Sequence, residues 1–128
     1  MALLLDTHVV LGLVDEALYP LPVRFADRIK KDTQQFIVSC ATLWEIALKH
    51  RIGKLPLSEP LSYWPEALAA ADFRLIGITH EHVLADVYPL PVTKDPFDRV
   101  LLATAAVERL QLASIDRALL DHPLAWRP

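Results

Sequence analysis

Residues 2–14, ALLLDTHVVLGLV, join an apolar run to an acid and then to a second apolar segment. The run Ala2–Leu5 has no polar alternation, which is typical of a short strand covered on both faces of a parallel sheet. Asp6 ends that run and opens the segment THVVLGLV. Ligands of open parallel sheets bind outside the carboxyl ends of the strands. The stretch therefore predicts both a parallel sheet and a site at Asp6.

Further apolar runs and helical stripes extend this prediction along the chain. Residues 36–39 and 111–115 are predicted as buried strands, and residues 75–78 are a weaker candidate. Helical spacing occurs in three sets, Phe25, Ala26 and Ile29, then Leu43, Ile46, Ala47 and His50, then Leu101, Ala105 and Leu112. The proline-rich residues 55–65 are expected to form a loop between helices. Strands that alternate with helices indicate a single α/β domain over residues 1–128, with a mostly parallel sheet flanked by helices.

The composition is that of an ordinary globular chain. Hydrophobic residues make up 53% and charged residues 23%, and the net charge is −3. This balance argues against a strongly basic protein that binds nucleic acid over its whole surface, although it leaves room for a local basic strip. The single cysteine, Cys40, excludes an internal disulfide and a multi-cysteine zinc cluster. Without a basic leader or a long apolar run, a cytoplasmic protein with no membrane segment is expected.

Four acids fall at the predicted carboxyl edge of the sheet. Asp6 ends the first strand, and Asp116 follows the run LQLASI. Glu45 lies in the helix after the second strand, and Asp98 lies one turn into the helix opened by Asp95. Clustered carboxylates repel one another unless a cation neutralises them, and Mg²⁺ or Mn²⁺ prefers oxygen ligands. The pattern predicts a divalent-metal site that activates water against a phosphodiester.

Each acid also has an ordinary structural explanation. Asp6 and Asp116 are suited to cap helices. Glu45 would form a capping box with Thr42, three residues earlier. Asp98 suits the positive end of a helix dipole in the first turn. For any one acid the structural explanation is favoured, and only their shared edge favours the metal site.

Four motifs in this sequence resemble those of a known family, LLDTH at 4–8, SCATLWEIALKHRIGKLPL at 39–57, DPFDRVLLATA at 95–105 and SID at 114–116. They resemble PIN-domain ribonucleases, and most closely the VapC-type toxins of bacterial toxin–antitoxin pairs, in the PilT N-terminus-like branch. The resemblance runs from residue 3 to about residue 126. It implies a PIN-like parallel sheet flanked by helices, Mg²⁺- or Mn²⁺-dependent endoribonuclease activity, and inhibition by a small VapB-type antitoxin.

The resemblance also implies roles for single residues. The catalytic and metal-binding acids would be Asp6, Glu45, Asp98 and Asp116. Thr7 and Ser114 match the family's hydroxyl residues beside the first and last acids, and Asp95 would cap a helix near the site. The chain departs from the family at Ile115, where a basic or small polar residue is usual. It departs again at residues 11–13, where aromatic residues are frequent.

Several other side chains have a functional and a structural explanation. The candidate contacts to RNA phosphates are Lys49, Arg51, Lys54 and Arg99. Lys49 would equally pair with Glu45 one turn away, and cations suit the last turn of a helix. Trp44 is expected in the core rather than as a stacking platform for RNA. His80 and His82 are expected at the surface, because their spacing on a helix does not suit zinc.

The expected partners are RNA, a small antitoxin and, given the high hydrophobic content, a second copy of the chain. Three alternatives remain open. A phospho-acceptor receiver domain also clusters acids at strand ends, but it needs a lysine where this chain has residues 114–116, SID. A PIN fold could serve for binding without catalysis. The same chemistry could act on DNA, which the sequence does not separate from RNA.

Overall fold

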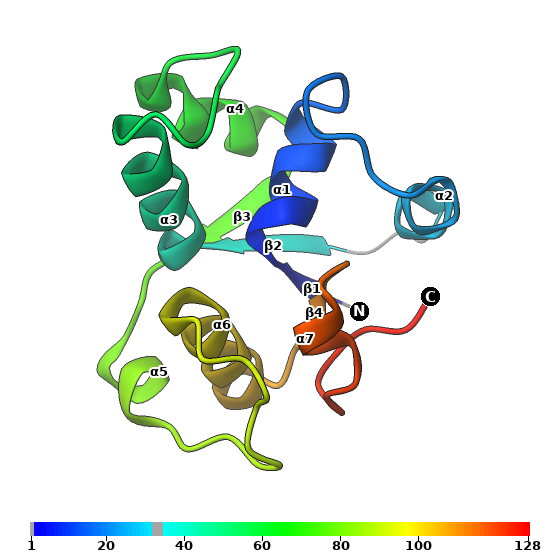
Figure 1. The fold of residues 1–128 in the computed structure, drawn as a ribbon, viewed down its shortest axis with the longest axis vertical. Helices are drawn as coiled ribbons and strands as arrows, with labels where there is room; N and C mark the ends of the chain where they lie inside the picture. Colours follow the sequence, from blue (N-terminus) through cyan, green and yellow to red (C-terminus); the bar gives the residue numbers. More distant parts are fainter. Residues whose placement is uncertain (1, 32–34) are drawn as a thin grey trace.

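The computed structural model describes residues 2–31 and 35–128, in which four parallel strands form one sheet in the order β3-β2-β1-β4 (Figure 1). The strands are β1 (Ala2–Leu5), β2 (Gln35–Ser39), β3 (Phe73–Ile76) and β4 (Gln111–Ala113). Leu4 of β1 pairs with Ile37 of β2 on one side and with Leu112 of β4 on the other. The predicted α/β fold with a parallel sheet is confirmed. Leu112 lies in β4 and not in the preceding helix, so its place in the third helical stripe was wrong.

Helices connect the strands and cover both faces of the sheet. They are α1 (Thr7–Val14), α2 (Val23–Lys31), α3 (Cys40–Arg51), the 3-10 turn η1 (Leu61–Tyr63), α4 (Trp64–Ala70), α5 (His80–Leu84), α6 (Pro96–Glu108) and α7 (Arg117–Leu120). The predicted loop over residues 55–65 is therefore partly helical, because it contains η1 and the start of α4. The described residues contain no helix long and apolar enough to cross a membrane.

The alternating sides of β1 build two hydrophobic layers. Leu3 and Leu5 pack with buried residues of α1, α2 and α4, whereas Leu4 packs with buried residues of α6. Figure 1 shows α1 and α4 on one side of the sheet and α5 and α6 on the other. Because the strands are parallel, their carboxyl ends share one edge, and α1, α3 and α6 all begin there.

Candidate active site

Asp6 and Ser114 meet at the end of the two neighbouring strands β1 and β4. Leu5 pairs with Ala113, so the residues that follow these strands are brought together. Asp6 is buried, and its Oδ1 accepts a hydrogen bond from the Val9 amide at 2.9 Å. Its Oδ2 accepts a hydrogen bond from the buried Ser114 hydroxyl. Asp6 is thus both the cap of α1 and a fixed carboxylate at the sheet edge.

Glu45 is buried on the second turn of α3, where two side chains bind its carboxylate. Thr7 donates its hydroxyl to Oε1 at 2.5 Å, and Lys49 forms an ion pair with Oε2. The cap of α3 is Ser39, whose side chain accepts from the Ala41 amide, so the predicted capping box was wrong. A buried carboxylate requires polar partners. Those of Glu45 are Thr7 of α1 and Lys49 of α3, and not a backbone amide at the start of α3.

Asp98 is held by a threonine that the sequence analysis missed. The buried Thr93 donates its hydroxyl to Oδ2 of Asp98 at 3.0 Å and accepts from the Asp95 amide at 3.2 Å. Ser114 behaves in the same way, since it donates to Asp6 and accepts from the Asp116 amide at 2.9 Å. The signal for both is a hydroxyl residue two positions before an acid, as in TKD at 93–95 and SID at 114–116.

Asp95 and Asp116 both cap helices, as their positions predicted. Asp95 accepts from the amides of Phe97 and Asp98 at 2.8 and 3.2 Å at the start of α6. Asp116 is exposed and accepts from the Ala118 amide at 2.9 Å at the start of α7. Each cap uses only Oδ1 of the carboxylate. Both acids can therefore cap a helix and still contribute negative charge at the sheet edge.

The acids act on one another electrostatically across this edge. Burial raises the pKa of Asp6 to about 6, and the negative charge of Asp98 adds to this effect. Burial also raises the pKa of Asp98 to about 6, against the opposing hydrogen bond from Thr93. The negative charges that raise the pKa of Asp98 further are those of Asp95, Asp116 and Glu45. The pKa of Asp98 therefore responds to Asp95 at the start of its own helix and to acids from two other parts of the chain, Glu45 and Asp116.

The donor chemistry of this edge fits a hard cation. Within residues 2–31 and 35–128 no three histidine, cysteine or acidic side chains are arranged to hold a metal ion as they lie. Lys49 and the Thr7 hydroxyl instead bind the Glu45 carboxylate. Mg²⁺ commonly takes only one or two carboxylates and keeps several waters, so it does not need a ready cage. Burial and, to a smaller extent, the negative charges of neighbouring acids raise the pKa of Asp6 and Asp98, and a bound cation would offset both effects.

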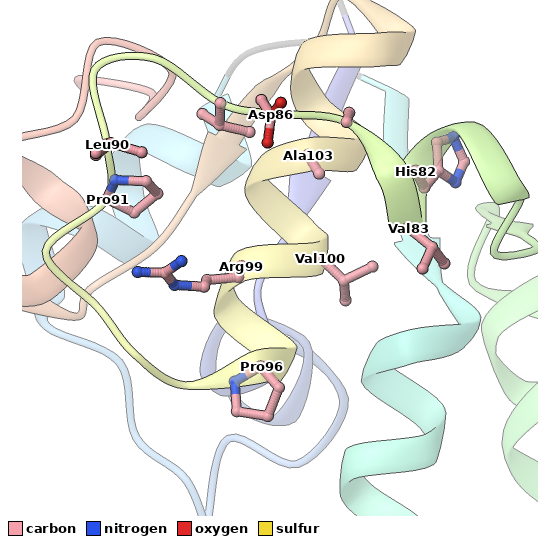
Figure 2. A pocket seen from close by; sticks show the side chains of 11 residues that line it. His82, Val83, Asp86, Leu90, Pro91, Pro96, Arg99, Val100 and Ala103 are labelled. Atoms are coloured by element: carbon pink, nitrogen blue, oxygen red, sulfur yellow. The ribbon is translucent and has the colours of Figure 1, made fainter.

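The four candidate phosphate-binding cations lie in different places. Lys49 lies among the acids, and its pKa is raised first by its hydrogen bond to Glu45 and then by the negative charges of the neighbouring acids. Arg51 and Lys54 are exposed at the far end of α3. Arg99 donates to the Thr93 carbonyl at 2.8 Å and lines a cavity of about 370 Å³ between α6 and the loop before it (Figure 2).

Two expectations about side-chain burial were wrong. Trp44 is 57% exposed, and its ring meets Phe97 edge to face with centroids 5.2 Å apart. His82 is buried beside the cavity of Figure 2, where its Nδ1 accepts from the Thr79 amide at 3.2 Å. Its Nε2 lies 2.8 Å from Oε1 of Glu108 on α6. His82 therefore joins α5 to α6 instead of lying at the surface.

Comparisons with known proteins find a partial relative in sequence and a likeness in fold. No protein-family model matches this sequence. Over 47 residues the chain is 38% identical to Ribonuclease VapC16 of Mycobacterium tuberculosis, a match that covers 36% of this chain and 33% of that protein. The fold is similar to a chain of a structure described as a toxin-antitoxin complex from Klebsiella pneumoniae, with a TM-score of 0.61 and 19% identity. That match covers 98% of this chain and 97% of the other. The resemblance to VapC-type toxins read from the motifs is confirmed as a likeness in a third of the sequence and in the fold.

Proposed function

We propose that this protein is a VapC-type endoribonuclease toxin that cleaves RNA with Mg²⁺ or Mn²⁺. The observation that carries the proposal is the convergence of acids from separate elements on one sheet edge, where burial and then the charges of Asp95, Asp116 and Glu45 raise the pKa of Asp98. The identity with Ribonuclease VapC16 supports RNA as the substrate, although it spans only a third of that protein. A receiver domain is disfavoured because Ser114, and no lysine, follows β4.

The four acids share one role in this proposal, and neighbouring hydroxyls support them. The metal would be held by Asp6, Glu45, Asp98 and Asp116. When bound, the ion activates a water and stabilises negative charge on the phosphodiester. The hydroxyls of Ser114 and Thr93 fix the carboxylates that they contact, and Thr7 does so for Glu45. Residues that orient metal ligands in this way commonly change metal affinity or activity when they are lost.

Cleavage of a mixed RNA pool with Mg²⁺, with Mn²⁺ and with a chelator tests the activity. We expect fragments only when the metal is present. A parallel pool of single-stranded DNA separates the two nucleic acids, because the metal chemistry alone does not distinguish them. Intact RNA under all conditions, with a correctly folded protein, would favour a PIN fold that binds without cutting and would end the nuclease proposal.

We also propose that a small VapB-type antitoxin covers this acidic edge in the cytoplasm and that the chain forms a homodimer. The fold likeness to a chain of a toxin-antitoxin complex supports the first partner. Exposed apolar residues support association, and a run of them extends from α5 into the following loop at Val83, Leu84, Tyr88, Leu90 and Val92. Sedimentation of the purified chain over a range of concentrations tests self-association.

A further inference from the structure

We infer that the exposed indole of Trp44 is a stacking platform for an unpaired base of the RNA strand, an inference that rests on the proposed function. Trp44 is 57% exposed, while the other two tryptophans, Trp64 and Trp126, are 5% and 6% exposed. A large aromatic ring left in water next to a candidate site is a feature that the core does not explain.

The indole of Trp44 lies between α3 and α6, the two helices that carry Glu45 and Asp98. Trp44 directly precedes Glu45 on α3, and Phe97 directly precedes Asp98 on α6. The two rings contact each other at an interplanar angle of 77°, so the aromatic pair bridges α3 and α6 beside the acids. Phe97 supports the indole against α6, while more than half of Trp44 stays open to solvent.

This arrangement suits a nucleic-acid strand. Phosphates need cations or a metal, whereas bases need flat apolar surfaces, and aromatic rings stack on any base. Lys49 supplies a cation five residues further along α3, one turn after Glu45, where the negative charges of Asp95 and Asp98 raise its pKa after the larger effect of Glu45. A strand whose phosphate lies over the acids would therefore find a surface for a neighbouring base at Trp44. Stacking of this kind selects single strands without reading their sequence.

Steady-state cleavage of single-stranded RNA in Mg²⁺ gives the first measurement. Loss of one base-stacking ring commonly weakens single-strand binding by roughly tenfold, so we expect Trp44→Ala to raise KM by about that factor, with a smaller change in kcat. Trp44→Phe keeps a ring and should recover part of the loss. Tyr63→Ala is the matched control, because Tyr63 is also 57% exposed but lies on η1. An unchanged KM in Trp44→Ala would overturn the inference.

Tryptophan fluorescence of the wild-type protein gives an independent measurement that needs no variant to fold. In chelator, where the RNA stays intact on a gel, a short single-stranded oligoribonucleotide should quench the emission. An abasic oligomer of equal length and charge should not quench it, because it has phosphates but no bases. The quenched component should be missing in Trp44→Phe. Equal quenching by the abasic oligomer would contradict stacking.

The competing explanation for the exposure of Trp44 is that its ring contacts a second copy of the chain in a dimer. If Trp44→Ala converted a dimer to a monomer at the assay concentration, and KM followed the loss of the dimer, the ring would be an interface residue and the inference would be wrong. A different result would contradict the proposed function, namely a wild-type protein that cuts no RNA in Mg²⁺. Quenching by the oligoribonucleotide would then still test whether Trp44 stacks on a base.

Discussion

The Thr7 hydroxyl lies 2.5 Å from Oε1 of Glu45 and joins the first residue of α1 to the second turn of α3. The same relationship recurs at the two neighbouring acids, where Ser114 donates to Asp6 and Thr93 donates to Asp98. Each of the three residues that donate is more than nine-tenths buried. Neutral donors therefore help to orient all three carboxylates, and Glu45 is in addition paired with the cation of Lys49.

We expect Thr7→Val to keep the fold and to weaken the site. Valine has nearly the same shape but cannot donate, so Glu45 loses the group that orients Oε1. Loss of such a partner commonly costs roughly 10–100-fold in metal affinity or activity. Titration of Mg²⁺ against RNA cleavage measures the change as a higher metal requirement.

A matched variant separates this effect from the general cost of losing a buried hydroxyl. Thr104 is also buried, but its hydroxyl donates to the Val100 carbonyl at 2.7 Å within α6. Thr104→Val should leave the Mg²⁺ requirement unchanged. If both variants needed more Mg²⁺ to the same extent, the Thr7–Glu45 contact would have no special part in the site.

Asp98→Asn is expected to fold normally and to lose metal-dependent cleavage of RNA. The amide keeps the shape of the side chain, and it can still accept the hydrogen bond from Thr93. It removes the charge that an ion requires, so a loss of roughly 100-fold or more is expected. Purified protein is compared with wild type in RNA cleavage and in a thermal melt. Cleavage at the wild-type rate would show that Asp98 is not part of the site.

Much of the fold could be predicted because local signals and the global fold agree. The apolar run of β1 is buried throughout its last three residues, and Asp6 caps α1 where the sequence placed the acid. Asp95 before proline likewise gave the start of α6. These features depend on neighbours in sequence, which a sequence contains explicitly.

The predictions that were wrong concern contacts between segments that are distant in the sequence. Thr42 and Glu45 have the spacing of a capping box, but Glu45 points to Thr7, which is 38 residues away. Trp44 was expected in the core, and it is 57% exposed. The side of α3 that packs is decided by α1 and α6, which the helical spacing of α3 alone does not reveal. His82 is buried for the same reason, because Glu108 of α6 supplies its partner.

An antitoxin that inhibits this protein is expected to insert an arginine among the acids. A guanidinium binds carboxylates through paired hydrogen bonds and carries a permanent positive charge. Burial and, less strongly, the neighbouring acids raise the pKa of Asp6 and of Asp98, so a positive charge placed among them would be favourable. Replacement of that arginine by alanine in the antitoxin should restore RNA cleavage by the complex. A native complex that cut RNA as fast as the free toxin would exclude inhibition by occlusion.

Without metal, the stability of this protein is expected to depend on pH. Burial raises the folded-state pKa of Asp6 and of Asp98 to about 6, against 3.8 as the ordinary value. An acid whose pKa is raised in the folded state binds its proton more tightly there than in the unfolded chain. Its contribution to the stability of the fold is therefore fully present below about pH 4. That contribution is lost as the pH rises through about 6. In chelator the melting temperature of the wild-type protein, relative to Asp6→Asn/Asp98→Asn, should therefore fall over this interval. The double variant keeps the cap of α1, because asparagine also accepts from the Val9 amide.

Mg²⁺ or Mn²⁺ should reverse the loss above pH 6, because an ion that binds only the folded state stabilises it. At a free concentration of about 100 times its dissociation constant the gain is roughly 2.7 kcal/mol, which is several degrees in melting temperature for a domain of this size. Salt alone screens the same charges, so the melts in chelator, Mg²⁺ and Mn²⁺ are run at matched ionic strength. The wild-type protein should gain stability from the metal, and Asp6→Asn/Asp98→Asn should not. An equal gain in both proteins would place the ion elsewhere, and the shared acidic edge could then no longer support the nuclease proposal.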